Sequence, residues 1–139
     1  MKTRLALSLA AVLAAGGLSA CGGDDSAPSC DAAPLMLTQG TWCITITGTN
    51  NTCSAGIAAP YWVDLAQTGS TLEMTSQYGI SYTGSLCGNT GTVADRGPPA
   101  DVVTTIVFAS ADAGSGSARW NTGTCSGTDT FTAAAGVCP

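Results

Sequence analysis

The segment TWCITIT, residues 41–47, alternates strictly between two kinds of side chain. Trp42, Ile44 and Ile46 share one face, and the other face carries threonines and Cys43. Successive side chains of an extended strand point to opposite sides of its sheet, so this alternation is typical of a strand with one buried face. The segment therefore predicts a half-buried β-strand.

The same texture continues toward the C-terminus. Short runs rich in Thr, Val, Ile, Tyr and Trp are separated by Gly, Asn, Ser and Pro, which favour turns. Further strands are expected at residues 61–67, 72–74, 80–86, 102–109, 118–122 and 129–133. About seven or eight short strands joined by short turns predict an all-β domain, an antiparallel meander that closes as a small barrel or folds as a sandwich.

The start of the first strand resembles two known families of barrels. Residues 40–42, Gly-Thr-Trp, are similar to the opening of the lipocalin and avidin barrels, which place a Gly-x-Trp there with the Trp plugging the barrel floor. Residues 82–85, Tyr-Thr-Gly-Ser, are similar to the hairpins of such barrels. In lipocalins a late Arg often stacks on the Trp, so the resemblance gives Arg119 a cation–π contact with Trp42. A core Trp42 in an unrelated β-sandwich is the alternative.

The cysteines predict disulfide bonds. Seven are present, and six of them follow Cys21. These are Cys30, Cys43, Cys53, Cys87, Cys125 and Cys138. An even number in a small exported domain indicates three disulfides, whereas a zinc site is disfavoured because the chain has neither His nor a CxxC pair. The sequence does not choose the connectivity, although proximity favours Cys43–Cys53 and Cys125–Cys138, which leaves Cys30–Cys87.

The first twenty residues are typical of an export signal. Lys2 and Arg4 precede a mostly apolar run over residues 5–18, and small residues follow. The run is shorter than the roughly 20 residues of a membrane-spanning helix. Residues 18–21, Leu-Ser-Ala-Cys, resemble the bacterial lipobox, in which the signal is cut before a Cys that carries lipid. The resemblance implies lipidation of Cys21, and a plain secreted protein is the alternative.

These features predict three parts of the chain. Residues 1–20 form a lipoprotein signal peptide, residues 21–34 a lipidated Cys with a short tether, and residues 35–139 a single β domain. We expect the cell envelope as the location, with the lipid bilayer as a partner through acylated Cys21. Because Gly rather than Asp follows Cys21, the resemblance implies the outer membrane in a diderm host.

Composition disfavours nucleic acid as a partner. After residue 20 the cations are Arg96 and Arg119, against nine acidic residues. So few cations cannot neutralise a phosphate backbone. We therefore expect no nucleic-acid partner.

The usual equipment of an enzyme is also missing from the sequence. The chain has no His, which removes Ser-His-Asp and Cys-His arrangements. Asp64 and Glu73 flank a predicted hairpin, but a solvated outer face explains them. Asp95 and Asp101 bracket a loop that could bind Ca²⁺, without the spacing of an EF-hand. We expect no enzyme activity, no catalytic residue, no metal site and no cofactor.

Two functions remain open. The first is a binding module for a small or apolar ligand, with Trp42, Tyr61, Trp62 and Tyr82 as candidate lining residues. The second is a structural or protein-interaction lipoprotein of the envelope without a pocket. A cavity lined by aromatic side chains favours the first, and a filled core with an exposed apolar patch favours the second.

Overall fold

The computed structural model describes residues 30–98 and 100–139. The predicted signal peptide, the lipidation site at Cys21 and most of the tether lie outside these residues and stay predictions. Within the described residues, no helix is long and apolar enough to cross a membrane.

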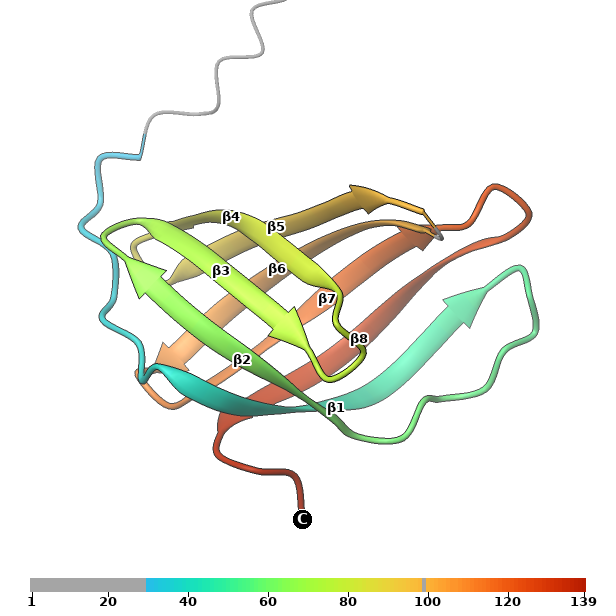
Figure 1. Ribbon diagram of the computed structural model, residues 1–139, viewed down its shortest axis with the longest axis horizontal. Coiled ribbons are helices and arrows are strands. Elements are labelled where there is room, and N and C mark those ends of the chain that lie inside the picture. The colour runs from blue at the N-terminus through green and yellow to red at the C-terminus, as the bar shows by residue number, and fades with distance from the viewer. Residues whose placement is uncertain (1–29, 99) are drawn as a thin grey trace, which may run out of the picture.

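Eight antiparallel strands follow one another around a closed barrel (Figure 1). They are β1 Gly40–Asn51, β2 Tyr61–Thr68, β3 Thr71–Ser76, β4 Ser81–Cys87, β5 Thr90–Gly97, β6 Ala100–Ser110, β7 Ala113–Asn121 and β8 Ser126–Ala135. Each strand pairs with the next, and β8 returns to pair with β1. The predicted all-β meander is confirmed, and the barrel is its form.

Two strands of the barrel are missing or incomplete in the prediction from sequence, and both carry glycine on their inner face. β5 was not predicted, and β7 begins five residues earlier than predicted. A Cβ at Gly91 of β5 would lie 2.8 Å from Leu72 Cδ1, and one at Gly116 of β7 would lie 2.9 Å from Phe131 Cζ. Large neighbours fill the space that these glycines leave, so neither segment shows the apolar alternation by which a strand is recognised.

One end of the barrel is closed by the chain before β1. Residues 35–39 cross this end, where the side chain of Leu37 is buried. The Leu35 amide donates to the Gly88 carbonyl at 2.7 Å, and the Leu37 amide donates to Gln67 Oε1 at 2.9 Å. Trp42, 1% exposed, donates from Nε1 to the Thr38 carbonyl at 2.7 Å. We call this the closed end, and Trp42 lies at its floor.

The opposite end is built differently. After Ile44, β1 pairs with β8 but no longer with β2, so the end of β1 separates from β2. An exposed connection over residues 52–60 leads back to Tyr61. This connection and the one between β7 and β8 lie at the right of Figure 1. We call this the open end.

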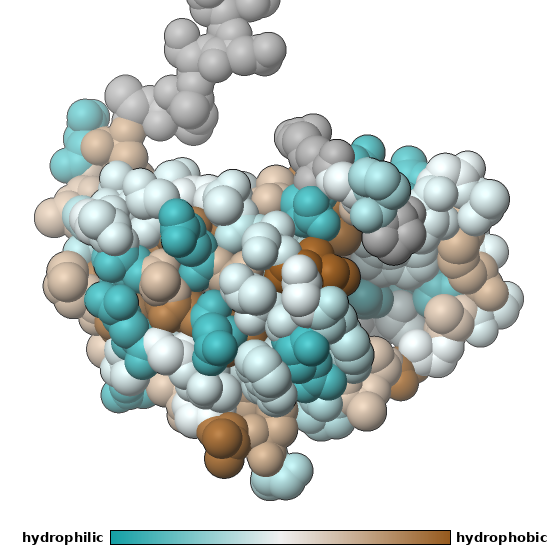
Figure 2. All heavy atoms as spheres, in the orientation of Figure 1, coloured by the Kyte–Doolittle hydropathy of each residue, from teal (hydrophilic) through white to brown (hydrophobic). Residues whose placement is uncertain are grey.

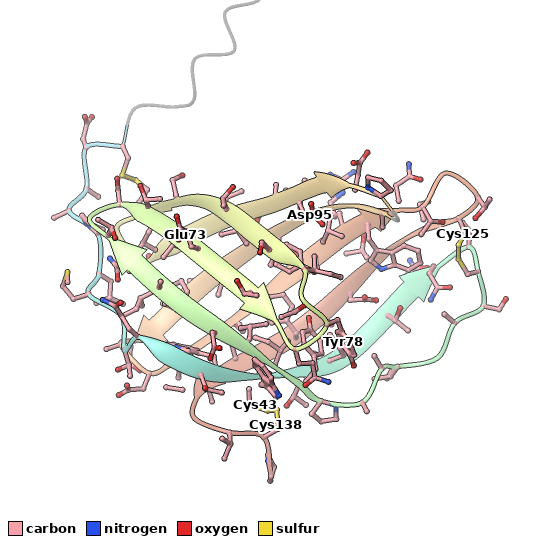
Figure 3. The ribbon with its side chains drawn as sticks, viewed as in Figure 1. Cys43, Glu73, Tyr78, Asp95, Cys125 and Cys138 are labelled. Carbon is pink, nitrogen blue, oxygen red and sulfur yellow. A yellow bond between two sulfur atoms is a disulfide. The ribbon has the colours of Figure 1, made fainter. Side chains whose placement is uncertain are left out.

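Three disulfides are present: Cys30–Cys87, Cys43–Cys138 and Cys53–Cys125. The number and the pair Cys30–Cys87 are confirmed, but the two pairs expected from proximity are wrong. Cys43 lies near the start of β1 and Cys53 follows its end, so about 33 Å of extended strand separates them. Each bonds instead to a neighbour in space, as Figure 3 shows.

Candidate functional site at the open end

Five polar or aromatic side chains on the inner face surround the open end. Their direction follows from strand alternation. Four of them lie an even number of residues from a buried core residue of the same strand, and Trp120 lies directly opposite inward-facing residues of the neighbouring strands. They are Tyr61 of β2, Tyr82 of β4, Asp95 of β5, Trp120 of β7 and Asp129 of β8. We call this set the mouth residues. Figure 2 shows the molecule hollowed at this end, beside the lobe formed by the two long connections.

The two tyrosines stand where the apolar core meets the mouth. Both are partly buried and pack against the core. Burial chiefly raises the pKa of Tyr61 to about 12, with added effects of Tyr82, Asp129 and Tyr78. Burial and then the Asp95 carboxylate raise the pKa of Tyr82. Both phenols therefore stay neutral near pH 7 and can donate a hydrogen bond.

The tyrosine hydroxyls are open to a guest molecule. Their raised pKa values arise from burial and neighbouring charged or ionisable groups, with no hydrogen bond from another described group. No buried side-chain nitrogen or oxygen among those residues lacks a partner, so both hydroxyls must reach solvent. They are free to bond water or a ligand in the mouth.

Each inward carboxylate is held by one of its two oxygens. Asp129 Oδ2 accepts a hydrogen bond from Trp120 Nε1 at 3.1 Å. Asp95 Oδ1 accepts one from the Gly97 amide at 3.1 Å, which fixes it beside the turn between β5 and β6. Figure 3 places Asp95 near the end of β5 and Tyr78 on the turn between β3 and β4. The remaining oxygen of each carboxylate can accept further donors.

Trp120 can adopt its position because the neighbouring strand offers glycine. A Cβ at Gly127 would lie 2.5 Å from Trp120 Cζ2 and 2.6 Å from Asn51 Cβ. Gly127 pairs directly with Trp120 across the strands. The missing side chain lets the indole lie against β8 and point its N–H toward Asp129.

A small cavity lies beneath the mouth. Its volume is about 40 Å³, and its wall includes Tyr61, Tyr82 and Thr104 among apolar side chains. This space suits a water molecule or two, whereas pockets for drug-sized ligands measure about 300–1,000 Å³. This cavity is therefore too small for an organic ligand, and a guest larger than water would lie above it, in the mouth.

A larger hollow of about 650 Å³ borders the open end. Alternation places most of its lining side chains, such as Arg119, Asp101 and Thr128, on the outer face. It is wide and open, and its polar side chains are mostly exposed. The groove shares Trp120 with the mouth. We treat the mouth as the candidate site, because its aromatic and acidic side chains lie on the inner face, where the barrel surrounds them.

The structure separates the four predicted lining residues. Tyr61 and Tyr82 face the mouth. Trp42 is sealed in the floor, where its ring meets Phe108 edge to face at 5.7 Å. Trp62 lies on the outer face and is 40% exposed.

The other mouth residues were missed as ligand contacts. One signal was present, since Asp129 has the same parity as buried Phe131 and Ala133 on one strand. A charged residue in phase with a core stripe indicates a position facing a cavity or mouth.

The structure also decides the expectations for Arg119 and for the pair Asp64 and Glu73. The stacking of Arg119 on Trp42 is wrong, because Arg119 is exposed on the outer face and pairs with Thr128, far along β8 from Trp42's partner Ala135. Asp64 and Glu73 do share one face, and both are exposed.

The loop considered for Ca²⁺ binding, between Asp95 and Asp101, gains no support from the acidic residues. Over the described part of the chain, no group of three or more His, Cys, Asp or Glu residues could hold a metal ion.

Comparison with known proteins identifies no relative. No family model matches the chain, and no curated protein or solved structure matches it at a significant level. The function must therefore be argued from the residues of the mouth.

Proposed function

We propose that this protein is a lipid-anchored binding protein of the bacterial cell envelope, which holds a small polar or amphipathic ligand at the open end of its barrel. The observation that carries the binding role is the convergence of five aromatic or acidic side chains on the inner face of one end. An inward Asp contributes little to a core, and the hydroxyl of an inward Tyr needs a polar partner, so their presence there favours a recognition role.

The anchor and the mouth are arranged compatibly. Cys30 is bonded to Cys87, which ends β4 at the closed end. From Cys21 to Cys30 the chain reaches at most about 30 Å. A lipid on Cys21 would therefore hold the closed end near the membrane and turn the mouth away from it, toward ligand in solution.

The apolar ligand considered from the sequence has less support than a polar one. The cavity of about 40 Å³ leaves no room for an acyl chain or a ring inside the barrel. The mouth above it carries carboxylates and hydroxyls, which favour a ligand with hydrogen-bonding groups.

A structural or protein-interaction role is the second candidate. The nearly filled interior favours it, because a barrel without a pocket serves as a durable module. Exposed apolar side chains on the described surface include Ile57, Trp62 and Tyr78, which a protein partner could cover.

Two measurements test the proposal. Labelled palmitate fed to the producing cells is expected to enter the protein, and the variant Cys21→Ser is expected to remain unlabelled. Label that persists in Cys21→Ser refutes the anchor.

Native mass spectrometry of the membrane-extracted protein tests the binding role. A co-purifying species that is lost from a variant carrying Tyr61→Ala and Tyr82→Ala supports the mouth as its site. Retention of that species in the variant, or its absence from the unaltered protein, moves the conclusion to the structural role.

A further inference from the structure

The inner face of the mouth combines negative charge with aromatic rings. Asp95 and Asp129 each leave one carboxylate oxygen unused by the hydrogen bonds described above. Arg119 is the cation whose side chain the structure describes, and it is exposed on the outer face of the barrel. The indole of Trp120 bonds to Asp129, so an aromatic ring lies next to this charge. The ring of Tyr61 lies 6.2 Å from that of Tyr78, which extends the aromatic surface toward the turn between β3 and β4.

A second observation, independent of the carboxylates, is a nearly buried hydroxyl that lies beneath them. Thr104 is only 8% exposed and lines the cavity beneath the mouth. Its hydroxyl makes no side-chain hydrogen bond within the described residues, and no buried polar atom there lacks a partner. The hydroxyl must therefore open onto the cavity, where a water molecule or a ligand group satisfies it.

From this arrangement we infer that the mouth binds an organic cation, an ammonium group carried on a small apolar body. The inference rests on the proposed binding function and names the class of its ligand. Carboxylates attract the positive charge, and the faces of Tyr and Trp rings stabilise an alkylated ammonium group by cation–π contact. An inorganic cation fits less well, because metal ions need more oxygen ligands than the two carboxylates supply.

The test uses choline and its uncharged isostere 3,3-dimethylbutan-1-ol, which share shape but differ in charge. The protein, purified from membranes in a non-ionic detergent, is labelled with ¹⁵N at its three tryptophans. Because Trp120 Nε1 bonds to Asp129, its indole signal reports on the mouth, while Trp42 and Trp62 serve as internal controls. We expect choline to shift the Trp120 signal alone, at a concentration at least ten-fold lower than the isostere requires.

The variant Asp129→Asn keeps an oxygen for Trp120 and removes the charge, so at least a ten-fold loss of choline affinity is expected. Asp64→Asn removes the same charge from the outer face and should leave choline binding unchanged. Unaltered Trp42 and Trp62 signals show that each variant is folded.

The remaining outcomes separate the two levels of the proposal. Equal shifts by choline and the isostere, retained in Asp129→Asn, overturn the cationic ligand and leave a binding mouth in place. If neither probe moves Trp120, the cationic ligand is overturned. A native mass spectrum without bound species then removes the binding function as well.

Discussion

The two ends of this barrel are built from the same eight strands but differ in the side chains that face inward. At the closed end, the inward side chains are large and apolar, and Trp42, Leu72, Leu86 and Phe108 are almost fully buried. At the open end, alternation brings Asp95, Asp129 and two tyrosines to the same inner face. Packing at the closed end therefore supplies the stability that allows polar residues to line the open end.

The largest expected effect is at the floor of the closed end. Trp42→Ala removes a fully buried indole and its bond to the Thr38 carbonyl, so we expect a loss of about 3–5 kcal/mol in the free energy of unfolding. Trp62→Ala deletes a 40% exposed ring from the outer face and should cost less than about 1 kcal/mol. Chemical denaturation under oxidising conditions measures both. Similar losses would show that the closed end is not the stabilising region.

Two of the disulfides allow the closed end and the open end to be compared, because each end contains one of them. Cys30–Cys87 holds the segment that closes the floor, and Cys53–Cys125 joins the two long connections at the mouth. Their sequence separations, 57 and 72, are similar, so replacing either pair with serine should lower the free energy of unfolding by a similar amount, about 2–4 kcal/mol. Limited proteolysis should distinguish them, with new cleavage in residues 52–60 only after loss of Cys53–Cys125. Cleavage there in the Cys30/Cys87 variant would mean that the ends are coupled.

The sequence predicts those strands in which large apolar side chains alternate with polar ones. Residues 41–47 and 61–67 carry that alternation and are strands in the structure. The pattern failed in β5 and the start of β7, where Gly91 and Gly116 make room for Leu72 and Phe131. Complementary packing between residues of different strands leaves no local signal in the sequence, so such strands are recognised only in the assembled barrel.

The candidate site was half predicted for a related reason. Tyr61 and Tyr82 were recognised because aromatic residues in strands suggest a pocket, whereas Asp129 required the phase of its strand. Trp62 was chosen by residue type, although alternation with Val63 already placed it on the outer face. Disulfide pairing failed where short sequence distance was taken as short spatial distance along an extended strand.

Alkaline pH is expected to destabilise the mouth specifically. The folded pKa of Tyr61, about 12, lies above the value near 10 for an unfolded tyrosine. The phenol's contribution to stability is therefore complete below about pH 10 and is lost as pH rises toward 12, at most about 2–3 kcal/mol in total. Absorbance titration at the phenolate band should show a late step whose amplitude falls by one tyrosine in Tyr61→Phe, while Tyr82, whose pKa is also raised, accounts for the remainder. A late step of unchanged amplitude in Tyr61→Phe would show that Tyr61 does not titrate late.

Gly127→Ala tests whether the position of Trp120 depends on a missing side chain. The new Cβ would crowd Trp120 and Asn51, and we expect a cost of about 1–2 kcal/mol with a shifted Trp120 indole signal. Gly123→Ala, in the exposed connection that follows β7, meets no neighbour but has a backbone φ of 83°, so its cost should come from conformation and leave Trp120 in place. An unshifted Trp120 in Gly127→Ala would mean that β8 does not position the indole.

The smallest expected effect on stability is at Asp129. Asp129→Asn preserves the acceptor for Trp120 and breaks no ion pair among the described side chains, so the free energy of unfolding should change by less than about 1 kcal/mol. Phe131, two residues further along the same inner face, is 4% exposed, and Phe131→Ala should cost about 3–5 kcal/mol. Denaturation of the two variants compares the ends on a single strand. If Asp129→Asn destabilised the protein by more than about 2 kcal/mol, the carboxylate would be part of the barrel's structural support, and the division between a stabilising end and a binding end would fail.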